Sequence, residues 1–159
     1  MHRSLTARLS GAAPLPDSPV AVVAGASRGL GLLVARAMAE RGCRVVGLSR
    51  SADSLVEAEI LMAGWGHSMV TYPCDVTSAE QVQEVVRRIE VERGPIDVAI
   101  HVAGIIQVGP MESMTPEHYR QCVDVMLWGP IHLTLAVLPG MRARGRGRIG
   151  VVTSIGGKV

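Results

Sequence analysis

The sequence predicts an α/β protein with a doubly wound, Rossmann-like parallel sheet of about five strands. Short, continuously apolar runs alternate with segments of helical periodicity from residue 20 onward. Such runs are typical of strands that are buried on both faces. A glycine-rich turn also joins the first apolar run to the first helical segment. Strict alternation implies right-handed crossovers and an open parallel sheet, in which ligands bind beyond the carboxyl ends of the strands.

The composition indicates one well-buried domain over residues 20–159. Apolar residues make up 48% of the 159 residues and charged residues 19%, which argues against disorder. The net charge is only +2, and no aromatic residue interleaves with the arginine cluster near the C-terminus. We therefore expect no nucleic-acid partner. The arginine cluster comprises Arg142, Arg144, Arg146 and Arg148.

The cysteines, the apolar runs and the N-terminus bear on the compartment of the protein. Cys43, Cys74 and Cys122 are too far apart for a metal pattern, and their odd number argues against a disulfide framework. No metal is expected, and a reducing cytoplasm is the default location. No uninterrupted apolar run reaches about 18 residues, so no membrane partner is expected. Residues 1–19 are interpreted as a disordered leader, with an organelle transit peptide as the alternative.

The elements of the first half follow from local patterns. Strands are predicted at residues 20–24, 44–49 and 68–73, and helices at 29–41 and 54–63. Gly42 ends the first helix.

The second half begins with a helix at residues 78–93, opened by a capping box from Ser78 to Gln81. A fourth strand follows at 96–102. Thr115, Pro116 and Glu117 then form a strong helix start. This helix is predicted to run to residue 142 with a kink at Pro130, before a fifth strand at 148–153.

The turn after the first strand carries the signal for a cofactor. Gly25, Gly29 and Gly31 follow a GxxxGxG spacing between a buried strand and a helix start. In that context glycines permit a sharp turn and a close approach of the backbone to a pyrophosphate, which the helix N-terminus attracts. The alternative is a glycine-rich turn without a ligand.

The loop after the second strand distinguishes between two cofactors. NAD-binding proteins place an acidic residue about 20 residues after the glycines, where it accepts hydrogen bonds from the ribose. Ser49 and Arg50 stand there instead. Because guanidinium groups suit phosphate, Arg50 and Arg28 favour the 2′-phosphate of NADP(H). The alternative is two exposed arginines that bind no ligand.

These residues resemble the motifs of the short-chain dehydrogenase/reductase family, from residue 20 to the end of the chain. Residues 24–31 resemble its TGxxxGxG motif, and residues 101–104 stand where the family has NNAG. Asp75 and Val76 resemble the pair that meets the adenine ring. The resemblance implies an NADP(H)-binding domain that is incomplete, with C-terminal strands and helices missing. The cofactor-binding residues that the spacing and the resemblance predict are Gly25, Ser27, Arg28, Gly29, Leu30, Gly31, Ser49, Arg50, Asp75, Val76, Ala103 and Gly104.

The resemblance also implies a catalytic serine at Ser154, in the loop after the fifth strand. In this family the serine works with a tyrosine and with a lysine four residues later, which lowers the pKa of the tyrosine. The 159 residues contain no such pair: Tyr72 and Tyr119 fall on other elements, and no tyrosine lies four residues before Lys158.

Two further positions depart from the family pattern. Met126 replaces the helical asparagine, and a thioether cannot hold the water that an amide holds. Asp124 is a poor substitute, because two residues along a helix point in different directions. His101 and Val102 replace both amides of NNAG. His101 is expected either to titrate near neutral pH or, as we favour, to satisfy local hydrogen bonds.

Three hypotheses about function follow. The first is an NADP(H)-dependent oxidoreductase that acts on a small carbonyl or alcohol, although this chain alone would bind cofactor without turnover. The second is a non-catalytic nucleotide-binding or oligomerising fragment of that family. The third, an S-adenosylmethionine-dependent methyltransferase, fits the glycine spacing poorly. A homo-oligomer through the helix 116–142 and ordinary burial of that helix remain equal alternatives, and an apolar edge at the fifth strand favours self-association.

Overall fold

The computed structural model describes residues 13–154 and contains a single parallel sheet in the order β3-β2-β1-β4-β5. All four pairings are parallel, and β1 lies at the centre. The strands are β1 Val20–Ala24, β2 Arg44–Ser49, β3 Met69–Pro73, β4 Ile96–His101 and β5 Arg148–Val151. The order reverses between β1 and β4, so the predicted doubly wound sheet is confirmed.

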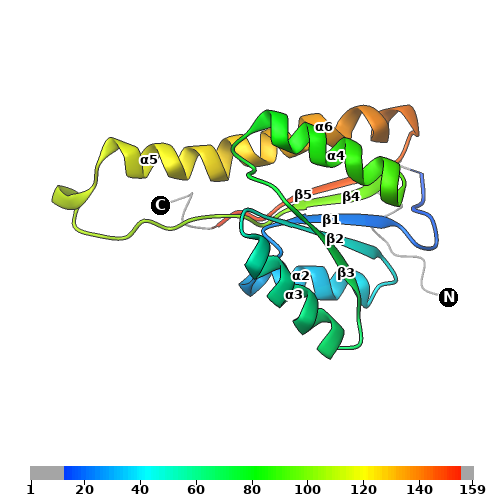
Figure 1. Ribbon diagram of the computed structural model, residues 1–159. Helices are drawn as coiled ribbons and strands as arrows, with labels where there is room; N and C mark the ends of the chain where they lie inside the picture. The colour runs from blue at the N-terminus through cyan, green and yellow to red at the C-terminus, as the bar shows by residue number, and fades with distance from the viewer. Residues whose placement is uncertain (1–12, 155–159) are drawn as a thin grey trace.

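Helices cover both faces of this sheet (Figure 1). On one face lie α2 Gly29–Ala39 and α3 Ala52–Gly64. On the other face lie α4 Ala79–Arg93 and α6 Gly129–Ala143. The sheet therefore forms the middle of three layers, which explains why the residues of β1 are all fully buried.

Two apolar clusters pack the layers together, one on each face. Val22 and Ile96 of the sheet pack with Leu133 of α6 and Ile89 of α4 on one face. On the other face, Val23 and Val45 pack with α2 and α3. These clusters fix the carboxyl ends of the strands relative to the helices, and that edge carries the loops with the predicted functional residues.

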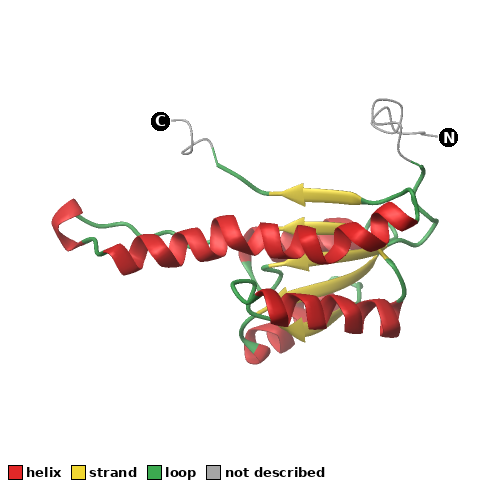
Figure 2. Ribbon diagram, turned by 90° about the horizontal axis from the view of Figure 1, so that it is seen from above, coloured by secondary structure: helices red, strands yellow, loops and turns green. Residues whose placement is uncertain are grey.

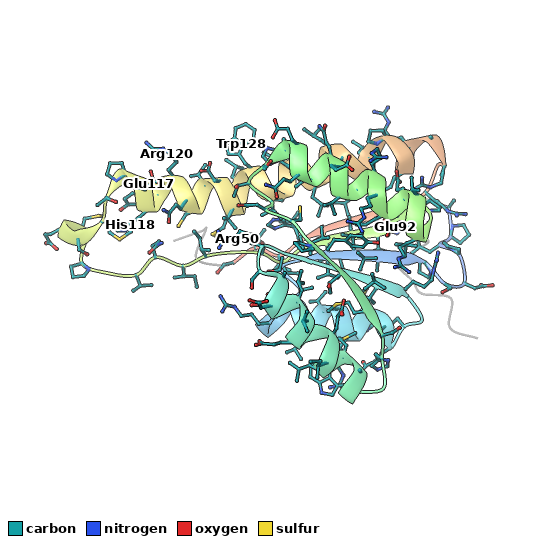
Figure 3. All side chains as sticks on the ribbon, viewed as in Figure 1. Arg50, Glu92, Glu117, His118, Arg120 and Trp128 are labelled. Atoms are coloured by element: carbon teal, nitrogen blue, oxygen red, sulfur yellow. The ribbon has the colours of Figure 1, made fainter. Side chains whose placement is uncertain are left out.

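A long helical arm projects beyond the carboxyl ends of the strands (Figure 2). After the short η1 Met111–Ser113, it contains α5 Pro116–Val123, the π turn η2 Asp124–Trp128, and then α6. Thr115 caps α5 in a reciprocal capping box with His118. The labelled Glu117, His118 and Arg120 lie near the tip of this arm (Figure 3).

The irregularity predicted at Pro130 takes the form of this π turn, one turn earlier. The Gly129 N–H bonds to the Asp124 carbonyl, five residues back. Pro130 has no N–H to offer a carbonyl four residues back, so the regular α-helical ladder is interrupted where the π turn ends. Pro130 then occupies the first turn of α6, a position that proline tolerates.

Several predicted boundaries differ from the structure. The capping box at α4 is only half formed: Ser78 accepts from the Gln81 N–H, but the Gln81 side chain accepts from the Asp75 N–H instead. The fourth and fifth strands end at His101 and Val151, before the predicted 102 and 153. Of the predicted leader 1–19, residues 13–19 contain no helix or strand, and residues 1–12 lie outside the described part.

Within the described residues, the continuous helix Pro116–Ala143 is long and apolar enough to cross a membrane by length and composition alone. This property was not predicted from the sequence, where the criterion was an uninterrupted run of apolar residues. Leu133, Val137 and Met141 of this helix are buried against the sheet, as in the core helix of a globular domain. Its other side, which includes Leu127 and Leu135, is more than half exposed.

Candidate functional site

The loops after β1, β2, β3 and β4 meet at the carboxyl edge of the sheet around a pocket of about 320 Å³. This volume is in the range of small-molecule sites, and its place is where doubly wound sheets bind ligands. The first two loops, with the first turn of α2 and the last residue of β2, line it with Gly25, Ser27, Arg28, Leu30, Gly31, Ser49 and Arg50. The next two loops and the π turn line it with Cys74, Asp75, Val76, Val102, Ala103, Gly104, Ile105 and Val125.

Two glycines of the first loop leave no room for side chains. Gly25 has a φ of +90°, and a Cβ there would lie 2.6 Å from the Ala103 nitrogen. A Cβ on Gly31 would lie 1.9 Å from the Gly25 carbonyl oxygen. The loop is thereby packed tightly against both β4 and its own helix. Gly29, with a φ of +55°, faces open space and does not line the pocket.

The N-terminus of α2 opens onto the first loop without a capping side chain. Arg28 stands at the N-cap in an extended conformation, its side chain makes no cap hydrogen bond, and the first turn has no acidic residue. The first N–H groups of a helix have no partner within the helix, and they carry a partial positive charge. This arrangement suits an anion such as a pyrophosphate.

Arg28 and Arg50 both line the pocket. Both residues are exposed, and neither side chain forms a hydrogen bond or an ion pair with another residue among 13–154. Arg50 lies where β2 ends and α3 approaches (Figure 3). The pair is therefore available to a phosphate ligand.

The third loop is held by its own side chains. The Asp75 carboxylate accepts from the Thr77 N–H at 3.0 Å and from the Thr77 hydroxyl at 2.9 Å, which shapes the turn into α4. Burial, and secondarily the charge of Asp75, raises the pKa of the Cys74 thiol to about 11. Cys74 therefore remains a neutral thiol at physiological pH and is a poor nucleophile.

His101 ends β4 beneath the helical arm, and its surroundings correct the expectation. It is only 2% exposed, and Nε2 has no hydrogen-bond partner among the described residues. Burial lowers the pKa of His101 to about 4. The imidazole is therefore neutral at physiological pH and does not titrate near neutrality. Its Nε2 also makes no hydrogen bond to another described residue. It does not line the pocket.

The π turn brings Val125, not Met126, into the pocket lining. Met126 is 51% exposed, and its Cγ lies 4.0 Å from the Cβ position of Gly104. Asp124 also lies outside the lining. Because neither side chain enters the pocket, nothing in the π turn replaces the missing amide.

Ser154 and the two tyrosines do not join the pocket. Ser154 is exposed beyond the end of β5. Tyr72 is buried on β3, where its hydroxyl donates to Glu92 at 2.6 Å, and Tyr119 contacts the Met111 sulfur on the arm. Lys158 lies outside the described residues.

Four lining residues were not predicted from the sequence. Cys74, Val102 and Ile105 adjoin predicted residues in the loops, so the rule that strand ends face the ligand extends to them. Val125 had no such signal, because its position depends on the π turn.

The fold and the pocket define a doubly wound α/β protein of the kind that binds ligands where the strand order reverses. The family described as short chain dehydrogenase matches residues 19–159. The chain belongs to this family.

Relatives and solved structures agree with this assignment. The chain is 34% identical to the ketoacyl reductase HetN of Nostoc over 86% of this chain and 48% of that protein. It is 30% identical to D-beta-hydroxybutyrate dehydrogenase of Cupriavidus necator over 90% and 55%. An actinorhodin polyketide ketoreductase variant crystallised with NADPH superposes with a TM-score of 0.84 at 32% identity, over 90% and 56% of the two chains. The chain thus spans about half the length of these relatives.

Proposed function

We propose that this chain binds NADP(H) in the pocket at the carboxyl ends of β1, β2, β3 and β4, as the cofactor-binding part of an oxidoreductase that acts on a small carbonyl or alcohol. One observation carries the proposal: an uncapped helix N-terminus and two unpaired arginines face one pocket. The first suits a pyrophosphate and the second suits a 2′-phosphate.

The residues present fit this cofactor. The missing side chains at Gly25 and Gly31 allow close packing of the loop, and a side chain at Gly31 would collide with the Gly25 carbonyl. Ser49, at the end of β2, and Arg50, directly after it, stand where an acidic residue would accept from an unphosphorylated ribose. A gluconate 5-dehydrogenase from Burkholderia cenocepacia, 28% identical with a TM-score of 0.82 over 91% of this chain and 57% of that one, was solved with NADP and tartrate.

When bound, NADP(H) supplies or accepts a hydride, and the protein binds and orients it. Among the described residues, the side chains that line the pocket include no tyrosine, lysine or histidine; the Asp75 carboxylate is bonded to Thr77, and Cys74 stays protonated. We therefore propose that the 159 residues bind cofactor without turnover. The alternative is a nucleotide-binding or oligomerising role without catalysis, through the helix 116–142.

We also make proposals about the oligomeric state, the location and the position of the family serine. Residues of the arm such as Leu127 and Leu135 are exposed and favour a homo-oligomer, whereas Leu133 and Val137 are buried in the domain. We propose a cytoplasmic location, with no membrane or nucleic-acid partner. We also propose Ser154 as the position of the family serine.

Titration of the chain with NADPH and NADH, followed by cofactor fluorescence, tests the cofactor assignment. We expect NADPH to bind more tightly, because charge-assisted hydrogen bonds to the 2′-phosphate contribute about 1.5–3 kcal/mol. Arg50→Ala should weaken NADPH binding by about tenfold or more and leave NADH binding nearly unchanged.

Arg142→Ala is the matched control, since Arg142 is an exposed arginine at the other end of the molecule. It should change neither affinity. Equal affinity of the wild-type chain for both cofactors would refute the NADP assignment. Absence of any binding would refute the cofactor-binding role, and steady NADPH oxidation with a carbonyl substrate would refute the lack of turnover.

A further inference from the structure

We propose that this pocket discriminates between the two redox states of the cofactor and binds NADPH more tightly than NADP+. The inference rests on the proposed function and adds a redox preference to it. It follows from the uneven distribution of charge over the pocket lining.

All charged side chains that line the pocket among residues 13–154 belong to Arg28, Arg50 and Asp75, which follow β1, β2 and β3. The hydroxyl groups of the lining, on Ser27 and Ser49, come from the same side. The strand order β3-β2-β1-β4-β5 therefore places the polar groups at β1 and on its β3 side, away from β4.

The β4 side of the pocket has the opposite character. Val102, Ala103, Ile105 and Val125 line it, and none of these side chains carries a charge or a hydrogen-bonding group. Outside the lining, the Cγ of Met126 lies 4.0 Å from the Cβ position of Gly104 and adds an apolar group beside this wall. Behind this wall His101 is buried and neutral.

The orientation of a bound dinucleotide decides which of its ends lies on the polar side of the pocket and which lies on the apolar side. In doubly wound folds a dinucleotide lies across the crevice, with the adenosine ribose at the residues that follow β2. The nicotinamide end therefore falls on the β4 side, against the apolar wall. The oxidised ring is a cation, and an apolar surface without a carboxylate gives that charge no partner. The reduced ring is uncharged and has no such penalty.

The two arginines face the 2′-phosphate, which is the same in both redox states, so the preference comes from the nicotinamide side of the pocket. We expect NADPH to bind on the order of tenfold more tightly than NADP+, a ratio that corresponds to about 1.4 kcal/mol.

The test is titration calorimetry of the wild-type chain with NADPH, NADP+ and 2′,5′-ADP, which lacks the nicotinamide. A carboxylate is then placed in the apolar wall with Ile105→Asp, and Ile105→Asn is the uncharged control of similar size. Ile105 is only partly buried, so both variants retain the rest of the core. The ratio of NADPH to NADP+ affinity, taken within each variant, should fall severalfold in the Asp variant and less in the Asn variant. The affinity of each variant for 2′,5′-ADP reports any general loss of the site.

The outcomes separate the two proposals. If 2′,5′-ADP binds but NADPH and NADP+ bind equally, the redox preference is wrong and the cofactor site stands. If the Asp and Asn variants shift the ratio equally, charge in the apolar wall does not set the preference, and the inference fails. If 2′,5′-ADP, NADPH and NADP+ all fail to bind, the proposed function fails and the redox preference with it.

Discussion

The imidazole of His101 fills the space where a side chain at position 129 would begin. A Cβ on Gly129 would lie 2.7 Å from Nε2 of His101 and 3.1 Å from a methyl carbon of Val76. Gly129 immediately follows the π turn and begins α6, while His101 ends β4. The absence of a side chain at Gly129 therefore sets how closely the helical arm approaches the carboxyl edge of the sheet.

Gly129→Ala should destabilise the chain by about 1–3 kcal/mol, because it overpacks a buried contact. Urea unfolding followed by circular dichroism measures this loss. In the double variant with His101→Ala, the cost of the alanine at 129 should fall, because the ring that it meets is gone. Additive losses would show that the imidazole is not the obstacle.

The buried His101 predicts a particular dependence of stability on pH. Its pKa is lowered from 6.5 to about 4 in the folded chain, so the unfolded chain takes up the proton first as the pH falls. The free energy of unfolding should therefore decrease from pH 6.5 towards pH 4, by roughly 3 kcal/mol from this residue. Denaturation at several pH values should show a shallower decrease for His101→Asn. Parallel curves for the two proteins would contradict the prediction.

Position 31 should tolerate substitution less well than position 29, although both glycines belong to the same motif. A Cβ on Gly31 would collide with the backbone of Gly25 at 1.9 Å, whereas Gly29 faces open space with a φ of +55°. Gly29→Ala should cost about 1–2 kcal/mol from its left-handed conformation. Gly31→Ala should cost more and also abolish NADPH binding. Thermal melting and cofactor titration of both variants provide the comparison.

Asp97 should be essential for stability at the opposite edge of the sheet. It is 2% exposed, accepts from the Val20 N–H at 3.2 Å and lies 3.4 Å from Nε of Arg146. Asp97→Ala leaves the Val20 N–H and the guanidinium without this partner and should cost about 3 kcal/mol or more. Asp97→Asn keeps an acceptor and should cost less.

A control for Asp97 comes from an exposed ion pair. Glu84 and Arg87 form a pair on α4 with side chains 60% and 68% exposed, and Glu84→Ala should leave urea unfolding unchanged. A similar loss for Asp97→Ala and Glu84→Ala would show that burial does not make the Asp97 contacts important.

The strands and the loops of the pocket could be predicted from the sequence, because apolar runs and glycine spacing are local patterns. The run Val20–Ala24 is fully apolar and becomes the central strand; Ser49 ends β2, and Arg50 follows it, as expected. Buried parallel strands read as continuous apolar runs, and the glycine spacing marks the turn after the first of them.

Two features were not predicted from the sequence. The π turn follows from Pro130, whose effect on the carbonyls before it was expected as a kink at the proline itself. The burial of His101 requires Gly129, 28 positions away in the chain, to leave room for the ring. Pattern and periodicity describe neighbours along the chain, so this second relationship was not visible before the fold was known.

The strand order also bears on how the chain forms during synthesis. β1 is made first and occupies the centre; β2 pairs with β1, and β3 then pairs with β2. β4 returns to the free side of β1, and β5 adds to β4. Every strand after β1 therefore finds a partner already made when it leaves the ribosome. The sheet can grow in the direction of translation, with domains folding as the chain emerges, and no strand has to wait for a later one.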